Sequence, residues 1–311
     1  MKTISPSRSR ATALLAVWGT VLFWGLSFVS SKTILNSGVP PMTMACIRFV
    51  VATIVLNLFL RKFDPAARLG KRDIIPLAAS GLFGVTIYFF FEVRGIKLTS
   101  ASHASLIIAT IPIFTVVAEA LLFRTRIAWI AAAGIVLSVT GVVFVVRPWG
   151  GALLAGSIVG DLLMFGACLS WVVYILLSKN LHKRMSEIAI TAYQSLFGTI
   201  FLVPLALLEH RQWVPITLVA GLNLAYLALF CSALTNFLYV YALSRLGPIV
   251  ISPYINLIPV VSVLGGVVLL GEALVWEQIV GGLLILAGVL IVNWKQGGGS
   301  KELIGQSPSR G

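Results

Sequence analysis

The stretch Trp24–Lys32 reads WGLSFVSSK, and the stretch Trp171–Lys179, 147 positions later, reads WVVYILLSK. In both, a tryptophan in an apolar segment is followed after six residues by a Ser-Lys pair that ends the segment. Further matches at the same offset are Gly19 and Gly166, Ile111-Pro112 and Ile258-Pro259, Gly134 and Gly281, and Gly141-Val142 and Gly288-Val289. Because Trp, Lys, Pro and Gly rarely coincide by chance in an apolar chain, these matches indicate two copies of one unit.

The composition indicates that these units lie in a membrane. Of the 311 residues, 59% are hydrophobic and 11% are charged, whereas about 25% are charged in an ordinary soluble domain. A helix of about 20 apolar residues crosses about 30 Å of hydrocarbon. The sequence predicts an all-α polytopic membrane protein with ten transmembrane helices, near residues 12–34, 41–60, 74–95, 101–123, 127–147, 157–178, 187–208, 215–239, 249–271 and 275–294.

The basic residues between these helices predict the orientation. With the N-terminus in the cytoplasm, seventeen of the 23 lysines and arginines lie in cytoplasmic segments, five lie on the other side, and Arg48 lies inside a helix. Cytoplasmic loops carry the excess of basic residues. We therefore predict an integral membrane protein with both termini in the cytoplasm. The net charge of +13 is explained by this placement, so no nucleic-acid partner is expected.

Each copy contains five helices, and an odd number inverts the second copy relative to the first. We predict a cytoplasmic segment at residues 1–11, a first repeat at 12–147, a second repeat at 157–294 and a flexible tail at 295–311. The first helix is too long for a secretory signal core and is retained. Inverted repeats are typical of secondary transporters, in which the two halves exchange conformations around a site near the middle of the membrane.

Several motifs carry a resemblance to a known family. They are WGLSFVSSK, PPMTMACIRF (Pro40–Phe49), KLTSASHASLIIATIPIF (Lys97–Phe114), LSWVVYILLSK (Leu169–Lys179), LSRLGPIVISPYINLIPVV (Leu243–Val261) and LLGEAL (Leu269–Leu274), with Gln278, Gly281 and Gly288. From about Ala16 to Asn293 the chain resembles the ten-helix EamA branch of the drug/metabolite transporter superfamily. The resemblance implies an exporter of amino acids or related metabolites, most similar to exporters of aromatic amino acids. One departure is that Gly271-Glu272 has no counterpart in the first half, which reads LFRTRI (Leu122–Ile127) there.

Charged residues and prolines within the helices are candidates for the transport pathway. Pro112 and Pro259 lie at equivalent positions in mid-helix, where proline removes a backbone hydrogen bond and kinks the helix. Arg48 lies about 12 Å along its helix, so this buried charge needs a partner: Glu92, helix-end carbonyls or a substrate carboxylate. Glu92 either faces the pathway or pairs with Arg94 or Lys97 at the outer interface.

Aromatic residues form the second group of candidates. Trp24 and Trp171 lie in mid-helix, away from the interfaces where tryptophan is usually found. With Tyr88, Tyr174 and Tyr239 they are predicted to form a wall for a flat apolar side chain; packing in the core is the alternative. Asn236, one turn before Tyr239, is added to the candidate cavity lining. Lys32 and Lys179 are interpreted as anchors at helix ends; Glu119, Asp161 and His103 are assigned to the interfaces.

Other classes of function fit the sequence less well. Cys46, Cys168 and Cys231 all lie inside helices, so neither a disulfide framework nor a metal site is expected. The three histidines are scattered, which argues against an enzyme, and no catalytic residue or cofactor is predicted. No nucleotide-binding loop is present. The expected partners are a small-molecule substrate and the lipid bilayer. Alternative cargoes are a cationic drug, a nucleotide-sugar or a sugar-phosphate.

Overall fold

The protein is described from a computed structural model, which covers residues 6–67, 69–124, 127–146 and 155–304. All regular elements in these ranges are helical, and ten helices among them are long and apolar enough to cross a membrane. They run from Arg10–Asn36 to Trp276–Asn293, within a few residues of the predicted positions. The predicted fold class is confirmed.

The first half contains five spans, two of them composed of more than one helix. The first two spans are α1 (Pro6–Asn36) and α2 (Pro41–Phe63). The third combines α3 (Lys71–Gly81), the π-helical segment η1 (Leu82–Ile87) and α4 (Tyr88–Leu98). The fourth is divided into α5 (Ala101–Ile108) and α6 (Ile111–Phe123), and the fifth is α7 (Trp129–Val146).

The second half repeats this plan. Its spans are α8 (Ala155–Ser178); α9 (Glu187–Leu208); α10 (Leu218–Ala225), η4 (Tyr226–Leu234) and α11 (Thr235–Leu246); α12 (Pro248–Ile255) and α13 (Ile258–Leu270); and α14 (Trp276–Ile304). Two short 3-10 turns, η2 (Leu181–Lys183) and η3 (His210–Gln212), lie in the connections. The π-helical segments η1 and η4 overlap at equivalent positions, and the interruptions of the fourth and ninth spans also coincide.

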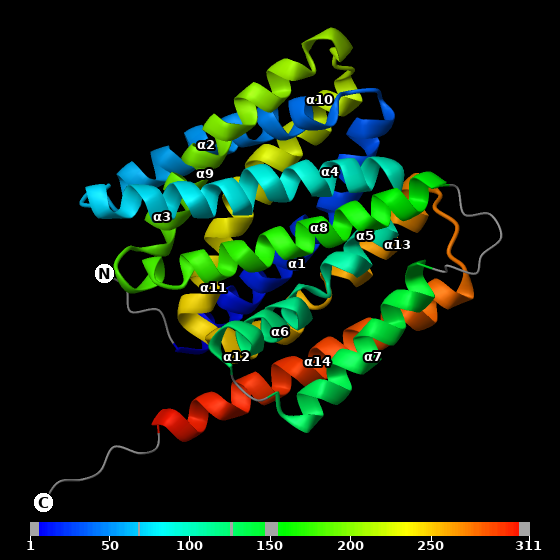
Figure 1. Cartoon of the computed structure of the whole chain (residues 1–311). Coiled ribbons are helices and arrows are strands. Elements are labelled where there is room, and N and C mark those ends of the chain that lie inside the picture. The colour runs from blue at the N-terminus through cyan, green and yellow to red at the C-terminus, as the bar shows by residue number, and fades with distance from the viewer. Residues whose placement is uncertain (1–5, 68, 125–126, 147–154, 305–311) are drawn as a thin grey trace, which may run out of the picture.

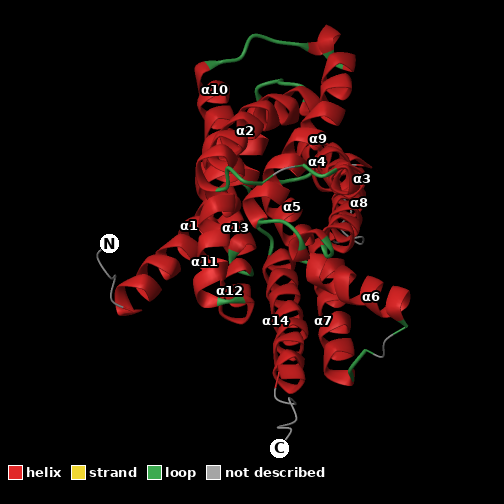
Figure 2. Ribbon diagram, turned by 90° about the vertical axis from the view of Figure 1, so that its left-hand side faces the viewer, coloured by secondary structure: helices red, strands yellow, loops and turns green. Residues whose placement is uncertain are grey.

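The two halves are related by a two-fold arrangement that is clearest where α7 packs on α14. These helices lie side by side along one flank of the bundle (Figures 1 and 2). A Cβ on Gly134 would lie 2.8 Å from the carbonyl oxygen of Gly288, and one on Gly281 would lie 2.6 Å from that of Gly141. Glycine is required for this close approach. Since position 134 corresponds to 281 and 141 to 288, the two-fold rotation that relates the halves also relates these two contacts between antiparallel helices.

The ends of the spans define two faces of the bundle. We call the end at which α1 begins and α14 ends the terminal face, and the other end the opposite face (Figure 1). The largest buried cluster lies between them and includes Met44, Val93, Ile96 and Met164, none of which is exposed to solvent.

The helix α14 extends to Ile304, beyond the position at which the second repeat is predicted to end. Gly297–Gly299 weaken a helix but do not block its hydrogen bonds, and the segment contains no proline to end it. Residues 305–311 lie outside the described ranges. At the other end, α1 begins at Pro6, a residue that is well tolerated in the first helical turn.

Candidate functional site

The five predicted wall residues form two groups of aromatic contacts, which together we call the aromatic row. The ring centroids of Trp24 and Tyr239 are 5.7 Å apart, those of Trp171 and Tyr174 are 4.7 Å apart, and those of Trp171 and Tyr88 are 4.8 Å apart. Each group contains residues of both halves: Trp24 of the first half contacts Tyr239 of the second, and Tyr88 of the first half contacts Trp171 of the second.

The π-helical segments position this row. In a π-helical turn the backbone hydrogen bonds join residues five apart and not four apart as in an α-helix. Such turns are frequent at functional sites. The indole N–H of Trp24 donates to the carbonyl of Cys231 in η4 at 3.0 Å. In the equivalent place, the Ser170 hydroxyl donates to the carbonyl of Phe83 in η1 at 2.7 Å. Each π-helical segment is thus bound by the first helix of the other half.

Arg48 is buried beside the row. The residue is 6% exposed, and its Nε donates to the hydroxyl of Ser232 in η4 at 2.8 Å. The guanidinium carbon lies 4.8 Å from the ring centre of Phe89 and 5.5 Å from that of Phe49. The direct contacts of Arg48 are therefore a hydroxyl and two aromatic faces, which the sequence did not suggest. Cation–π contacts of this kind stabilise a desolvated guanidinium.

Glu92 is the buried carboxylate near Arg48. It is 6% exposed, and its Oε1 accepts a hydrogen bond from the hydroxyl of Tyr88 at 3.1 Å. Its Oε2 has no hydrogen-bond partner among the described residues, and the charge of Arg48 acts on the carboxylate through space. The alternative pairing with Arg94 does not form: the Arg94 guanidinium lies 3.9 Å from Glu209.

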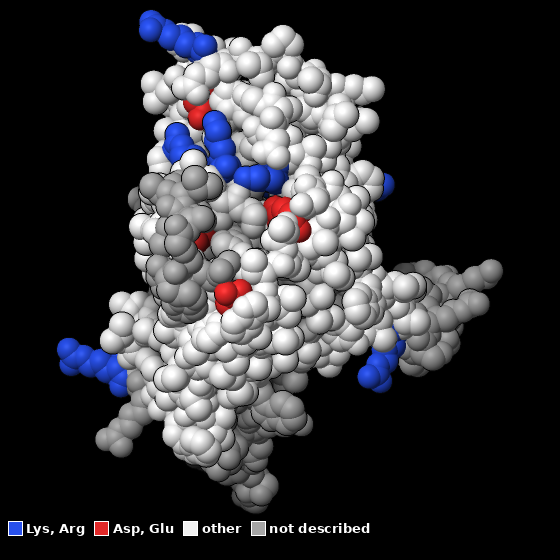
Figure 3. All heavy atoms as spheres, turned by 90° about the vertical axis from the view of Figure 1, so that its right-hand side faces the viewer, with Lys and Arg blue, Asp and Glu red and all other residues white. Residues whose placement is uncertain are grey.

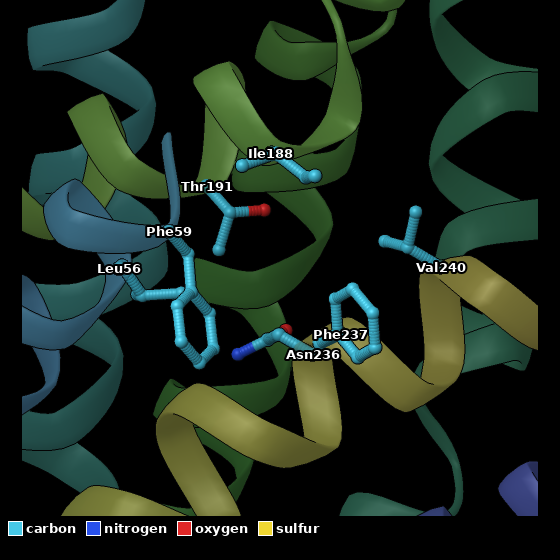
Figure 4. A pocket seen from close by; sticks show the side chains of 7 residues that line it. All are labelled: Leu56, Phe59, Ile188, Thr191, Asn236, Phe237 and Val240. Atoms are coloured by element: carbon cyan, nitrogen blue, oxygen red, sulfur yellow. The ribbon is translucent and has the colours of Figure 1, made fainter. Parts of the chain in front are cut away.

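Asn236 lines a small pocket close to the terminal face. The pocket is a small, mostly apolar hollow between α2, α9 and α11 (Figure 4). The Asn236 amide donates to the carbonyl of Ser232, the residue that also binds Arg48, at 2.6 Å. The other lining residues are Leu56, Phe59, Ile188, Thr191, Phe237 and Val240.

Pro112 and Pro259 both lie where a span is interrupted. The helix α5 ends at Ile108 and α6 begins at Ile111, so Pro112 is the second residue of α6. Pro259 has the same place in α13. The interruption follows from the missing N–H of proline, which is accepted in the first turn of a new helix but not in the interior of a continuous one.

At the opposite face, polar side chains bind backbone groups of the other elements. Lys32 donates to the carbonyls of Ile96 at 2.8 Å, Lys97 at 3.2 Å and Thr99, at the end of α4. The Glu272 carboxylate accepts hydrogen bonds from the first N–H groups of α5 at 2.7 and 3.0 Å. Figure 3 shows this side: basic and acidic atoms lie close together in the upper middle of the view, and further basic side chains project at its edges.

The structure adds detail to two residues assigned from the sequence. Asp161, near the start of its span, is 2% exposed and accepts a hydrogen bond from the Thr99 hydroxyl at 3.0 Å, so it is buried against the end of α4. Lys32 binds carbonyls at a helix end and is more than an anchor. Its counterpart Lys179 has a different role, since its ammonium lies 3.2 Å from Glu119. Repeat symmetry alone did not reveal this difference.

Lys32→Met is expected to lower the free energy of unfolding by about 2 kcal/mol, because charge-assisted hydrogen bonds to three carbonyls are lost. The matched control is Lys179→Met, which removes an exposed ion pair worth less than about 1 kcal/mol. Thermal unfolding of the purified variants measures both. Equal losses for the two lysines would contradict the assigned difference.

Comparisons with known proteins agree with this architecture. A model of the EamA-like transporter family matches the chain twice, over residues 11–147 and 158–294. A protein of Salmonella typhimurium named "Probable amino-acid metabolite efflux pump" is 29% identical over 297 residues, which cover 91% of this chain and 95% of that protein. A "Probable terminal-alkyne amino-acid exporter" of Streptantibioticus cattleyicolor is 28% identical over 291 residues, with 92% and 96% covered.

Two further similarities extend over nearly the whole chain. An "Uncharacterized transporter" of Archaeoglobus fulgidus is 29% identical over 293 residues, which cover 93% of this chain and 99% of the relative. A crystal structure with 19% sequence identity has a TM-score of 0.64 and covers 92% of this chain and 98% of its own, so it shares the fold. Because the family match occurs in both halves and leaves few residues unmatched, the protein belongs to the EamA-like transporter family, a family of membrane transporters and not of enzymes.

Proposed function

We propose that this membrane transporter exports amino acids, aromatic ones above all, across the bacterial inner membrane, with its terminal face in the cytoplasm. The observation that carries the proposal is the aromatic row between the two halves, with the guanidinium of Arg48 buried beside it. Aromatic side chains bind flat apolar groups, and a guanidinium binds a carboxylate. An aromatic amino acid has both groups.

Alternating access is the proposed mechanism. The pocket lined by Asn236 lies near the terminal face, whereas Lys32, Glu272 and Asp161 connect elements at the opposite face. In the proposed cycle, the halves exchange conformations about the axis that relates them. The paired breaks before Pro112 and Pro259, and the paired π-helical segments, are the hinges.

The charges near the row favour an amino acid over the other cargoes. A phosphate group would require several inward basic residues, and Arg48 is the basic residue that lies beside the row. Two relatives are named as an amino-acid exporter and an amino-acid metabolite efflux pump. A cationic drug is the second candidate, because Glu92 has a buried oxygen without a partner among the described residues.

The experiment is uptake of radiolabelled amino acids into proteoliposomes that contain the purified protein. Tryptophan and phenylalanine are expected to enter faster than alanine and lysine, and protein-free liposomes give the background. Transport of a cationic dye with no uptake of any amino acid would favour the second candidate and contradict the first.

A further inference from the structure

A polar cluster that the proposed pathway does not use lies at the opposite face. The Nδ1 atom of His103, in α5, is 3.5 Å from Oδ1 of Asp161, in α8. The same carboxylate oxygen accepts the hydrogen bond from Thr99. The amide nitrogen of Gln278, in α14, contacts Nε2 of His103. The cluster joins α5 of the first half to two helices of the second.

Two atoms in this cluster are buried and incompletely satisfied. The side chain of His103 is 12% exposed and that of Asp161 is 3% exposed. Nδ1 of His103 and Oδ2 of Asp161 have no hydrogen-bond partner among the described residues. Buried polar atoms are nearly always paired, so an unpaired nitrogen and oxygen in neighbouring side chains call for a functional reason.

The internal repeat provides a control for the role of the cluster in folding. An offset of 147 residues places an apolar residue at each equivalent position. The equivalents of Thr99, His103, Asp161 and Gln278 are Leu246, Val250, Leu14 and Ala131, in that order. The equivalent helices α1 and α12 are in contact at the terminal face without these polar groups. The cluster is therefore a feature of one face and not a requirement of the architecture.

We propose that His103 and Asp161 form a proton-binding site, and that a bound proton favours closure of the opposite face. The inference rests on the proposed alternating access but not on the identity of the cargo. It adds a means by which a proton gradient biases the transport cycle.

The hydrogen bonds around His103 indicate where the proton binds. Oε1 of Gln278 accepts a hydrogen bond from the N–H of Val275 at 3.3 Å, so the amide NH₂ group faces His103. Nε2 of the neutral imidazole is then the acceptor, and Nδ1, which lies 3.5 Å from Oδ1 of Asp161, carries the hydrogen. Addition of one proton to Nε2 forms one N–H bond and gives the imidazolium.

Two changes follow from that proton. The imidazolium faces the Asp161 carboxylate with a full positive charge, and a charge-assisted contact is about twice as strong as a neutral one. It links α5 to α8, and therefore one half to the other. The new Nε2–H also repels the amide NH₂ of Gln278, so the amide turns its oxygen toward His103 and releases the N–H of Val275.

Other charged groups face this region from the surrounding elements. Glu272 precedes α14 and binds Ala101 and Ser102, and Glu277 is buried in α14 beside Gln278. Lys32 of α1 binds the carbonyl of Thr99. Lys97 is exposed at the end of α4, and Arg94 lies near Glu209 farther along the face. His103 is the histidine of this group, and imidazole is the type of side chain whose ordinary pKa lies between pH 5 and 8.

The test measures the opening of the opposite face by pulsed electron paramagnetic resonance, with no cargo present. Nitroxide labels are attached to cysteines at Leu98 and Gln212, exposed residues of the two halves, after Cys46, Cys168 and Cys231 are replaced by alanine. Distances are recorded in lipid nanodiscs at about pH 8 and about pH 5.5, on either side of the ordinary histidine pKa. The ratio of short to long distances is expected to rise about fivefold or more at the lower pH.

The variants separate His103 from other sources of pH dependence. His103→Gln and Asp161→Asn keep side chains of similar size, and each is expected to abolish the change in the ratio. His210→Gln alters an exposed histidine in the connection between α9 and α10 and is expected to retain it. The proposal is overturned if the labelled parent shows no pH response, or if either cluster variant responds as the parent does. Two independent variants keep the test valid should one fail to fold.

Discussion

Replacing Arg48 with glutamine is expected to reduce tryptophan transport about 100-fold and to lower the free energy of unfolding by about 3 kcal/mol. The guanidinium is buried against Ser232 and Phe89. Glutamine is neutral and shorter, so the Glu92 carboxylate loses the positive charge that acts on it. Transport in proteoliposomes and thermal unfolding measure the two effects.

Two comparisons isolate the reason for the loss. Tryptamine has no carboxylate, so its transport is expected to fall much less than that of tryptophan in Arg48→Gln. Adding Glu92→Gln should restore part of the lost stability, because the two charges interact. Arg94→Gln is the matched control, since Arg94 is partly exposed and belongs to a looser pair worth less than about 1 kcal/mol. An equal fall for tryptophan and tryptamine would show that Arg48 has no contact with the carboxylate.

Trp171→Ala is expected to weaken transport of aromatic amino acids about tenfold while reducing transport of alanine much less. The indole contacts both Tyr88 and Tyr174 and so is the middle ring of its group in the aromatic row. Loss of aromatic contacts costs about 1 kcal/mol each beyond the lost buried area. Trp24→Ala, at the equivalent position next to Tyr239, should show the same selectivity.

The alternative role of these tryptophans is packing in the core. In that case both variants would lower the melting temperature and would reduce the transport of all substrates alike. Removal of a core side chain of this size lowers the free energy of unfolding by about 3–5 kcal/mol, whichever substrate is transported. Trp129→Ala is the matched control. This tryptophan is 79% exposed at the start of α7, and its loss should leave both transport and melting temperature close to those of the unaltered protein.

Spans and repeats were predictable because they depend on composition and residue identity. Ten apolar runs and one constant offset are visible in the sequence, and a proline in mid-span leaves few local arrangements. The paired π-helical segments were not predictable. Their register depends on partners far away in the chain, such as the indole of Trp24 on Cys231 and the hydroxyl of Ser170 on Phe83. No local pattern encodes such contacts.

The partners of charged residues were also beyond the sequence. The depth of Arg48 and Glu92 in their helices indicates that both are buried. The packing between helices, which the sequence does not show, determines that Ser232 is the hydrogen-bond partner of Arg48. Asp161 is near the start of its span and was assigned to the interface for that reason. It is buried because α8 packs closely on the end of α4: a Cβ on Gly160 would lie 2.9 Å from the backbone nitrogen of Thr99.

The central claim is that aromatic amino acids pass between the two halves from the terminal face. Val240 lines the pocket at that face without belonging to the aromatic row. In protein whose native cysteines are replaced by alanine, Val240→Cys is treated with a water-soluble thiol reagent, and the rate is recorded with no amino acid, with tryptophan and with alanine. The account predicts that tryptophan slows labelling several-fold and that alanine at the same concentration does not. Labelling at one rate under all three conditions would contradict it.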